Sequence, residues 1–326
     1  MAELLSPSSL DLSSGQGVRL SRLLGPLEGG PFVAHPVGGG HSSTLVRLDL
    51  PGGEPVAVVK LCDGVATKVL AESAALELLA AQGFAAAPRV WGSGTGTKAA
   101  GLVLSWLGGR GARTLDAARD AIDAATVGAA LGQWLARLHE VRVPVGAVRF
   151  SDDPLPWGRR VQHQAEQARR RLLRRSDLAP EVVALSVVAL DSVVADAEVW
   201  LTEPRPGRLI HRDLRGANIV LDGDGGFAGV VDFERAGAGD PAWDFAKLRW
   251  WVLDAHPGLE APLTAAYRAV RPVPCEERRR LYRRFEAATM VAWFGAGHPV
   301  YLRECVAQLR AELRGGGPVP WCVELR

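Results

Sequence analysis

The feature that most constrains this chain is a change in hydrophobic periodicity about one third of the way along it. Before residue 107, short β-type runs alternate with glycine-rich turns, and one helical pattern spans residues 65–83. After residue 107 the helical patterns are longer and more numerous, at residues 117–141, 162–175, 180–201, 261–270, 276–295 and 300–313. We therefore expect an α+β fold of two lobes. Residues 1–106 would form a small antiparallel sheet with one helix, and residues 107–326 a larger, mainly helical lobe.

One segment interrupts the helical half with short apolar runs and polar loops. It contains RLIHRDLRGANIVL, which ends at Leu221, and VVDFERAGAGDPAWDFAKL, which ends at Leu248. Polar loops held between apolar runs are typical of functional sites. Such a segment inside a helical lobe is therefore the first place to look for chemistry.

The polar residues of this segment suit phosphoryl transfer. That reaction needs a carboxylate beside the attacking hydroxyl, oxygen ligands for Mg²⁺, and positive charge on the phosphates of the nucleotide. Asp213 would accept or orient the proton of the substrate. Asn218 and Asp232 would bind Mg²⁺, and Lys60, at the end of the apolar run VAVVK, would contact the phosphates.

These motifs resemble the aminoglycoside phosphotransferase and choline kinase-like family, a branch of the protein-kinase fold, from about residue 30 to the C-terminus. The motifs that carry the resemblance are the two segments above, the stretch LARLHEV before them, and VAVVK followed by a helical glutamate. The resemblance implies an ion pair between Lys60 and Glu72, with Glu77 on the same helix as the alternative. It also implies that ATP or GTP is the donor and that backbone groups from Ser105 to Leu107 hydrogen-bond the adenine ring.

Glycine clusters occur at three places, and we interpret them differently. Gly39, Gly40 and Ser42 lie one hairpin before Lys60, and this position favours phosphate binding. The loop matches neither common phosphate-binding pattern, so a plain turn is the alternative. The clusters at residues 92–98 and 222–226 lack the helix or the ligands of a binding loop, and we predict hairpin turns there.

One departure from the family pattern bears on the substrate. The family usually has glycine at the position of Arg212, whereas protein kinases have arginine there, as this chain does. However, only 12 positions separate Asp232 from Asp244, too few for the segment that protein kinases use to hold a peptide. We therefore expect the hydroxyl of a small molecule as acceptor, and we predict scaffold roles for His211 and Asp244.

Three classes of function remain open at this stage. The leading one is a small-molecule O-phosphotransferase, plausibly one that inactivates an antibiotic, with a metabolite kinase of the choline or homoserine kinase type as its alternative. The others are a protein kinase and an inactive nucleotide-binding scaffold. The intact set of Lys60, Asp213, Asn218 and Asp232 disfavours the scaffold.

Two features of the sequence, its arginines and its tryptophans, bear on which acceptor the protein would bind. Arginines crowd the predicted helices at residues 169–175 and 278–284, which favours a neutral, zwitterionic or partly anionic acceptor over a polycation. Solvated helix faces are the alternative explanation for these arginines. Trp243, Trp250 and Trp251 would form either a stacking wall for the acceptor or part of the core.

The overall composition excludes several classes of protein. The net charge of +2 on 326 residues does not suggest a nucleic-acid partner. The four cysteines form no CxxC pair, so neither a zinc site nor a disulfide framework is indicated. No apolar run reaches the roughly 18 residues of a membrane span, and no secretory signal is visible, so we expect a cytosolic protein. The oligomeric state stays open.

Overall fold

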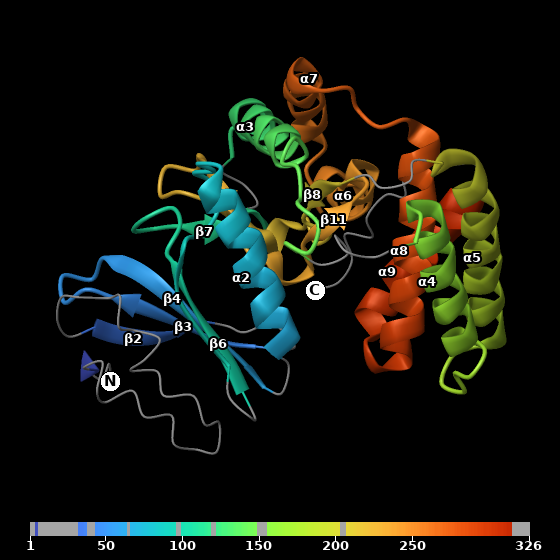
Figure 1. The fold of residues 1–326 in the computed structure, drawn as a ribbon, viewed down its shortest axis with the longest axis horizontal. Coiled ribbons are helices and arrows are strands. Elements are labelled where there is room, and N and C mark those ends of the chain that lie inside the picture. Colours follow the sequence, from blue (N-terminus) through green and yellow to red (C-terminus); the bar gives the residue numbers. More distant parts are fainter. Residues whose placement is uncertain are drawn as a thin grey trace.

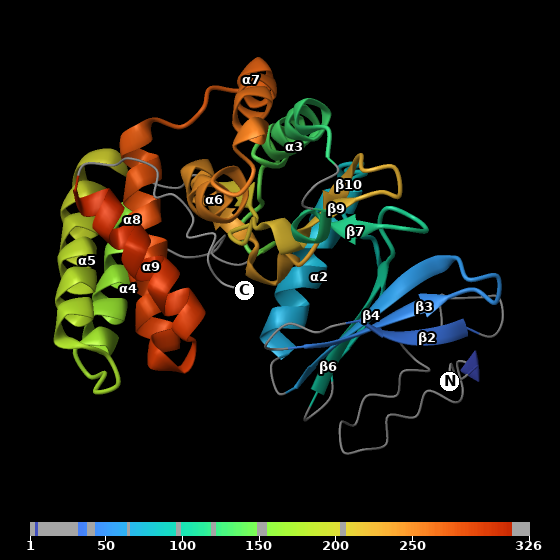
Figure 2. The same cartoon turned by 180° about the vertical axis from the view of Figure 1, so that it is seen from behind.

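The computed structural model describes residues 4–5, 32–37, 43–63, 66–95, 99–118, 122–148, 155–202 and 207–314. It confirms the expected α+β arrangement of a small antiparallel sheet with one helix beside a larger helical part (Figure 1). The same two parts are seen from behind in Figure 2. No helix within the described residues is both long enough and apolar enough to cross a membrane.

The first part is a six-stranded sheet in the order β1-β2-β3-β4-β6-β5, with every neighbouring pair antiparallel. Its strands are β1 (Leu4–Leu5), β2 (Phe32–Val37), β3 (Thr44–Asp49), β4 (Pro55–Asp63), β5 (Val90–Thr95) and β6 (Ala99–Ser105). The helix α2 (Ala66–Ala81) lies between the sheet and the helical part (Figure 1). The pairing of β5 with β6 confirms the hairpin predicted at residues 92–98.

Alternation along β4 decides which way Lys60 points. Val59 and Leu61 are buried in a cluster with Phe32 and Leu48 on one face of the sheet. Because successive side chains of a strand point to opposite faces, Lys60 projects from the other face. Its neighbour Cys62 on that face belongs to the core shared with α2. The sheet therefore directs Lys60 toward α2 and the helical part.

Within the described residues, the second part contains six long helices. They are α3 (Ala124–Leu138), α4 (Trp157–Leu172), α5 (Pro180–Trp200), α7 (Glu260–Val270), α8 (Glu276–Phe294) and α9 (Pro299–Leu313). The helix α3 packs along α7, whereas α4, α5, α8 and α9 form a bundle farther from the sheet (Figures 1 and 2). These helices agree with the predicted patterns, with two corrections. The helix α4 begins at Trp157 and ends at Leu172, whereas its pattern predicted residues 162–175, and α3 begins later than predicted.

The second correction concerns the start of α3, because the pattern from residue 117 predicts one continuous helix. Instead, residues 115–118 form a short 3₁₀ turn and the α-helix begins at Ala124. The carboxylate of Asp123 accepts hydrogen bonds from the amides of Ala125 (3.0 Å) and Thr126 (3.3 Å). A side chain that caps these amides favours a helix start at this point.

Short strands and turns connect the helices next to the sheet, as predicted for residues 208–248, although the segment ends in a helix. They are β7 (Arg113–Thr114), β8 (Arg208–Ile210), β9 (Ile219–Leu221), β10 (Phe227–Val230) and β11 (Gly237–Gly239), followed by α6 (Asp244–Leu248). The order is β10-β9-β7 in one small sheet and β11-β8 in another. The turn between β9 and β10 is tight, as predicted, because Asp222 accepts hydrogen bonds from Asp224 and Gly226.

The boundary between the lobes stays a prediction. We propose that it lies between residues 106 and 107, because the last strand before it, β6, pairs within the large sheet. The next strand, β7, pairs with β9 of the helical part.

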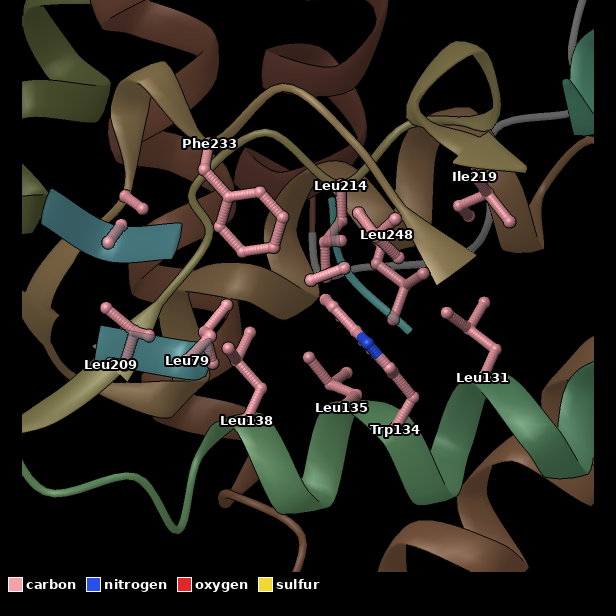
Figure 3. Close-up of a cluster of buried hydrophobic side chains, with 14 of the residues drawn as sticks. Leu79, Leu131, Trp134, Leu135, Leu138, Leu209, Leu214, Ile219, Phe233 and Leu248 are labelled. Carbon is pink, nitrogen blue, oxygen red and sulfur yellow. The ribbon is translucent and has the colours of Figure 1, made fainter. Parts of the chain in front are cut away.

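A shared core supports the loops of the helical part from below. Figure 3 shows Leu131, Trp134, Leu135 and Leu138 of α3 pointing toward side chains of the loop segments. Those partners include Leu214, Ile219, Phe233 and Leu248, and Leu79 of α2 joins them. Both segments that carry the predicted catalytic and metal-binding residues therefore rest on one hydrophobic cluster.

Candidate active site

Lys60 is the centre of the first cluster of predicted site residues. Its Nζ lies 2.8 Å from Glu72 Oε2, 2.7 Å from Asp232 Oδ1 and 3.2 Å from Glu234 Oε2. Burial by itself would lower the pKa of Lys60, but these carboxylates outweigh burial and hold the pKa above its usual value. The cluster thus joins β4, α2 and the loop after β10 through one cation.

The structure distinguishes between the two glutamates of α2. Glu72 is buried, and its second oxygen accepts a hydrogen bond from the amide of Phe233 (3.1 Å). Glu77 instead accepts a hydrogen bond from Ser73, one turn earlier on the same helix (2.7 Å). The ion pair expected between Lys60 and Glu72 is therefore present, and Glu77 does not take part in it.

Asp213 lies in a second cluster, held by a lysine that sequence reasoning did not assign. Lys247 Nζ lies 2.5 Å from Asp213 Oδ1, and Arg215 Nε lies 3.9 Å from Asp213 Oδ2. Burial raises the pKa of Asp213, but Lys247, Arg235 and Arg215 outweigh burial and hold it well below its usual range. Asp213 is therefore an ionised hydrogen-bond acceptor.

The two predicted metal ligands, Asn218 and Asp232, each contact one of these two clusters. Asn218 Nδ2 donates to the backbone carbonyl of Asp213 (2.9 Å). The backbone carbonyl of Asn218 accepts a hydrogen bond (2.9 Å) from the amide of Val231, which precedes Asp232. Asp232 has left-handed backbone geometry (φ 68°), which is uncommon outside glycine, asparagine and aspartate. Its side chain is 30% exposed. Asp232 thus keeps access to solvent while Lys60 holds one of its oxygens.

A buried network holds the backbone of the loop that carries Asp213. Asp244 accepts hydrogen bonds from the amides of His211 (2.8 Å) and Arg212 (2.5 Å). It also lies 3.0 Å from His139 Nε2, and the side chain of His211 contacts the carbonyl of Val231 (3.1 Å). His211 and Asp244 therefore hold backbone, in agreement with the scaffold roles expected for them.

Arg212 explains how this chain tolerates a large residue where the family usually has glycine. Its φ is 65°, in the left-handed region that favours glycine. The guanidinium lies 4.1 Å from the centre of the Trp243 ring, and Trp243 in turn donates a hydrogen bond to Glu286 (2.6 Å). Stacking of an arginine on tryptophan contributes about 0.5–2 kcal/mol, which offsets a backbone cost of about 1–2 kcal/mol.

Of the three backbone amides in the expected adenine-binding segment, residues 105–107, two already have an acceptor in the protein. Within the described part of the chain, the amides of Ser105 and Trp106 donate to the carbonyls of Arg89 (2.9 Å) and Val56 (2.9 Å). No acceptor for the amide of Leu107 lies among the same residues. The Leu107 amide is thus the donor in this segment that a ligand could use. Gly39, Gly40 and Ser42 lie outside the described residues.

The arginines of the bundle do not supply the charge that the sequence suggested for the acceptor. Five arginines in the first half of α8 pair with carboxylates. The pairs are Arg278–Asp240, Arg279–Glu276, Arg280–Glu312, Arg283–Glu312 and Arg284–Asp196. On α4, Arg170 and Arg171 are exposed. The alternative of paired and solvated helix faces therefore accounts for them.

Three residues of the site were missed by sequence reasoning. Lys247 contacts Asp213, Glu234 joins Lys60 to Lys68 (3.1 Å), and Arg215 flanks Asp213. The scarcity of lysine was a usable signal, since only four occur in the chain and two of them, Lys60 and Lys247, are buried beside carboxylates. No comparable signal marks Glu234 among many surface glutamates.

Fold and site together define a kinase-like small-molecule phosphotransferase. Residues 33–286 match the model of the phosphotransferase enzyme family, and the chain belongs to that family. The family resemblance expected from the motifs is confirmed by this match. A comparison with curated proteins gives no match.

Solved structures of similar fold include a thermostable mutant of aminoglycoside phosphotransferase APH(4)-Ia with ADP and hygromycin B. It is 16% identical, with a TM-score of 0.64 over 88% of this chain and 95% of the other. Macrolide 2′-phosphotransferase type I is 19% identical, with a TM-score of 0.57 over 94% and 98% of the two chains. The GDP and kanamycin complex of APH(2″)-IIia is 16% identical, with a TM-score of 0.59 over 86% and 93%. At these identities the likeness shows the fold, which is the predicted kinase-like one.

Proposed function

We propose that this protein is an ATP- or GTP-dependent O-phosphotransferase that transfers the γ-phosphoryl group to a hydroxyl of a small molecule. The observation that carries the proposal is the junction at Lys60, which lies within 2.8 Å of both Glu72 and Asp232. The strand β4, the helix α2 and the loop after β10, which is 172 residues further along the chain, thus meet at a cation that would neutralise phosphate charge.

Asp213 would orient the acceptor hydroxyl and receive its proton. Lys247 lies 2.5 Å from Oδ1, and Asn218 Nδ2 donates a longer hydrogen bond to Oδ2 (3.3 Å). Oδ2, which has the weaker partner, is the oxygen that would accept the hydrogen bond from the hydroxyl. The low pKa of this carboxyl keeps it ionised, which favours orientation of the hydroxyl over strong base catalysis. Lys60 would meanwhile hold the phosphates in line with that hydroxyl.

Mg²⁺ suits the oxygen donors of Asn218 and Asp232. Mg²⁺ is usually bound by one or two carboxylates together with phosphates, rather than by a cage of protein ligands. Among the described residues no group of three or more His, Cys, Asp or Glu forms a metal site, which agrees with that mode of binding. When bound, Mg²⁺ would neutralise charge on the β- and γ-phosphates.

The donor nucleotide would be bound by backbone groups of residues 105–107, chiefly by the amide of Leu107. Backbone recognition does not favour ATP over GTP, and the similar structures were solved with ADP in one case and GDP in another. Their acceptors are hygromycin B and kanamycin, and a macrolide is named for a third protein. An antibiotic-inactivating role is therefore our leading proposal, with a metabolite kinase as the alternative. Cytosolic location stays a prediction.

Transfer of labelled γ-phosphate is the direct test of the reaction. Purified protein would be incubated with Mg²⁺, labelled ATP or GTP, and pools of hydroxylated antibiotics and metabolites, with a protein and peptide pool in parallel. We expect label in small molecules. Label confined to the protein and peptide pool would overturn the proposal.

The metal role of Asp232 has its own test. In Asp232→Ala the loss of a ligand oxygen should abolish Mg²⁺-dependent nucleotide binding. Calorimetric titration with nucleotide, with and without Mg²⁺, would measure the effect, and Asp222→Ala in the turn between β9 and β10 is the matched control. An unchanged affinity in Asp232→Ala would contradict the assignment.

A further inference from the structure

Partly exposed aromatic side chains gather beside the cluster around Asp213. Trp251, Phe294, His298 and Tyr301 are all intermediate in exposure, unlike the fully buried tryptophans that precede them in the chain. They come from the turn after α6, the end of α8 and the start of α9. We call these four residues the aromatic cluster.

The rings of the aromatic cluster form one connected surface. Phe294 stacks on Tyr301 with ring centres 5.5 Å apart, and Tyr301 meets Trp251 edge to face at 6.3 Å. His298 lies 5.0 Å from Phe294. By contrast, Trp243 and Trp250 are each only 2% exposed and belong to the core. Of the three tryptophans that follow the metal loop, Trp251 is therefore the one that a ligand could reach.

Two cations join the aromatic cluster directly to Asp213. Arg215 flanks Asp213 and donates to the hydroxyl of Tyr301 (3.3 Å). Lys247 binds Asp213 and lies 5.6 Å from the centre of the Trp251 ring. A molecule whose hydroxyl reaches Asp213 would thus rest its remaining atoms against Tyr301 and Trp251.

The charges around the aromatic cluster limit what it would bind. The carboxylate of Glu304 accepts a hydrogen bond from Trp251 Nε1 (3.1 Å), and Glu286 is buried against Trp243. Lys247 and Arg215 add two positive charges on the side of Asp213. Beside Asp213 the cations Lys247, Arg215 and Arg235 outnumber the carboxylates of Asp213 and Glu286. A strongly polycationic acceptor would therefore meet net positive charge there, whereas a neutral or singly charged one would meet little repulsion.

From this arrangement we infer that the aromatic cluster is the acceptor subsite and that it takes a neutral or singly charged hydroxylated molecule with an apolar ring face. The inference rests on the proposed phosphotransferase function and adds its substrate class. Pockets for such ligands are lined mainly by aromatic side chains with a few polar groups that set orientation. Here Tyr301 and Trp251 supply the apolar wall, and Glu304 and Arg215 supply the polar groups.

A hollow of about 500 Å³ between α4 and α5 does not compete for this role. Its lining includes Arg169 and Asp191, which pair with each other at 3.0 Å. None of the lining residues belongs to the clusters around Lys60 or Asp213. A hydroxyl bound there would not meet the predicted catalytic carboxylate.

Steady-state kinetics with two acceptor sets tests the inference. One set holds macrolides and other ring-bearing alcohols with at most one basic group, and the other holds kanamycin and similar polycations. We expect the wild-type protein to favour the first set by at least ~10-fold in kcat/KM, a difference of about 1.4 kcal/mol. Transfer confined to the polycations, or no transfer to the first set, would overturn the inference.

Substitutions then locate the subsite. Tyr301→Ala and Trp251→Leu should raise KM for the acceptor by roughly 10-fold, since burying such a side chain contributes about 1.5–3 kcal/mol. KM for the nucleotide should stay within twofold of wild type. Tyr301→Phe keeps the ring and should retain most of the acceptor affinity. The matched control is Trp293→Ala, since Trp293 is 61% exposed and packs under Arg171.

Nucleotide binding separates this inference from the proposed function. If wild-type protein binds no Mg²⁺ nucleotide and hydrolyses none, the proposed function fails. If nucleotide binds normally but Tyr301→Ala and Trp251→Leu leave KM for the acceptor at the wild-type value, the subsite assignment alone fails. Circular dichroism of each variant would show that the fold is retained.

Discussion

The two buried lysines, Lys60 and Lys247, occupy opposite electrostatic settings. Lys60 contacts three carboxylates, from Glu72, Asp232 and Glu234. Lys247 lies near two carboxylates, Asp213 at 2.5 Å and Glu286 at 3.9 Å, but Arg215 and Arg235 approach the same two carboxylates, so cations outnumber carboxylates there. Accordingly the pKa of Lys60 lies above its usual value, whereas burial and Arg235 lower the pKa of Lys247.

This difference assigns different tasks to the two regions. A surplus of carboxylates around Lys60 suits a region that receives a metal ion together with phosphates. A surplus of cations around Asp213 suits a carboxylate that must stay ionised to hold a neutral hydroxyl. If this comparison is right, substitutions in the two regions will affect different kinetic constants.

The largest effect should follow from Asp213→Asn. The neutral amide can neither orient the hydroxyl as an ionised carboxylate does nor receive its proton, so kcat should fall by at least ~10²-fold, the lower end for loss of a general base. Nucleotide affinity should persist, because Asp213 belongs to the cluster on the acceptor side. Single-turnover kinetics together with calorimetry would measure both, and a turnover near that of wild type would contradict the role of Asp213.

The matched pair Lys60→Met and Lys247→Met tests the comparison itself. Lys60→Met should lower kcat/KM for the nucleotide by ~10²-fold, as expected for loss of one charged donor to the phosphates. Lys247→Met should lower kcat by roughly 10-fold while the nucleotide affinity stays the same, because a charge-assisted hydrogen bond that orients Asp213 is lost.

Both lysine variants need thermal unfolding as a control, since each leaves a buried carboxylate without its main partner. Equal losses of nucleotide affinity in the two variants would remove the distinction between the regions.

A smaller effect is expected at Arg212. Arg212→Ala loses the contact with Trp243 but keeps a side chain at a φ of 65°, whereas Arg212→Gly loses the contact and relieves the backbone. The glycine variant should therefore be more stable than the alanine variant by about 1 kcal/mol. Urea unfolding of the two variants would measure this difference. Equal stability would show that the backbone at this position is not strained.

The smallest effect concerns His139, which contacts Asp244, the residue that holds the backbone of the loop carrying Asp213. Burial lowers the pKa of His139 below its usual 6.5, although Asp244 acts in the opposite direction. The unfolded chain then binds more protons than the folded protein below about pH 6.5, so stability falls as the pH decreases through that range. His139→Gln should flatten this part of the stability curve in urea titrations at pH 5 to 8. A curve with the wild-type slope would contradict this assignment.

Much of the fold was predictable because it depends on local patterns. The helices α5, α7, α8 and α9 follow apolar spacing that repeats with the helical period, and the hairpin between β5 and β6 follows its glycine turn. The start of α3 was not, since the cap at Asp123 competes with a helical pattern that runs through it. The pairing of the arginines of α8 was not predictable for a related reason, because several of their carboxylate partners, such as Asp196 and Glu312, lie on other helices.

The sequence by itself determined which chemistry this protein carries. Lys60, Asp213, Asn218 and Asp232 were predicted as site residues from residue type and spacing, because phosphoryl transfer needs such groups and their spacing resembles that of the family. Only the tertiary structure decided which partners surround them. The pairing of Lys247 with Asp213 crosses 34 residues, and that of Lys60 with Asp232 crosses 172. Contacts between distant segments depend on how helices and sheet pack, and no local pattern in the sequence records that packing.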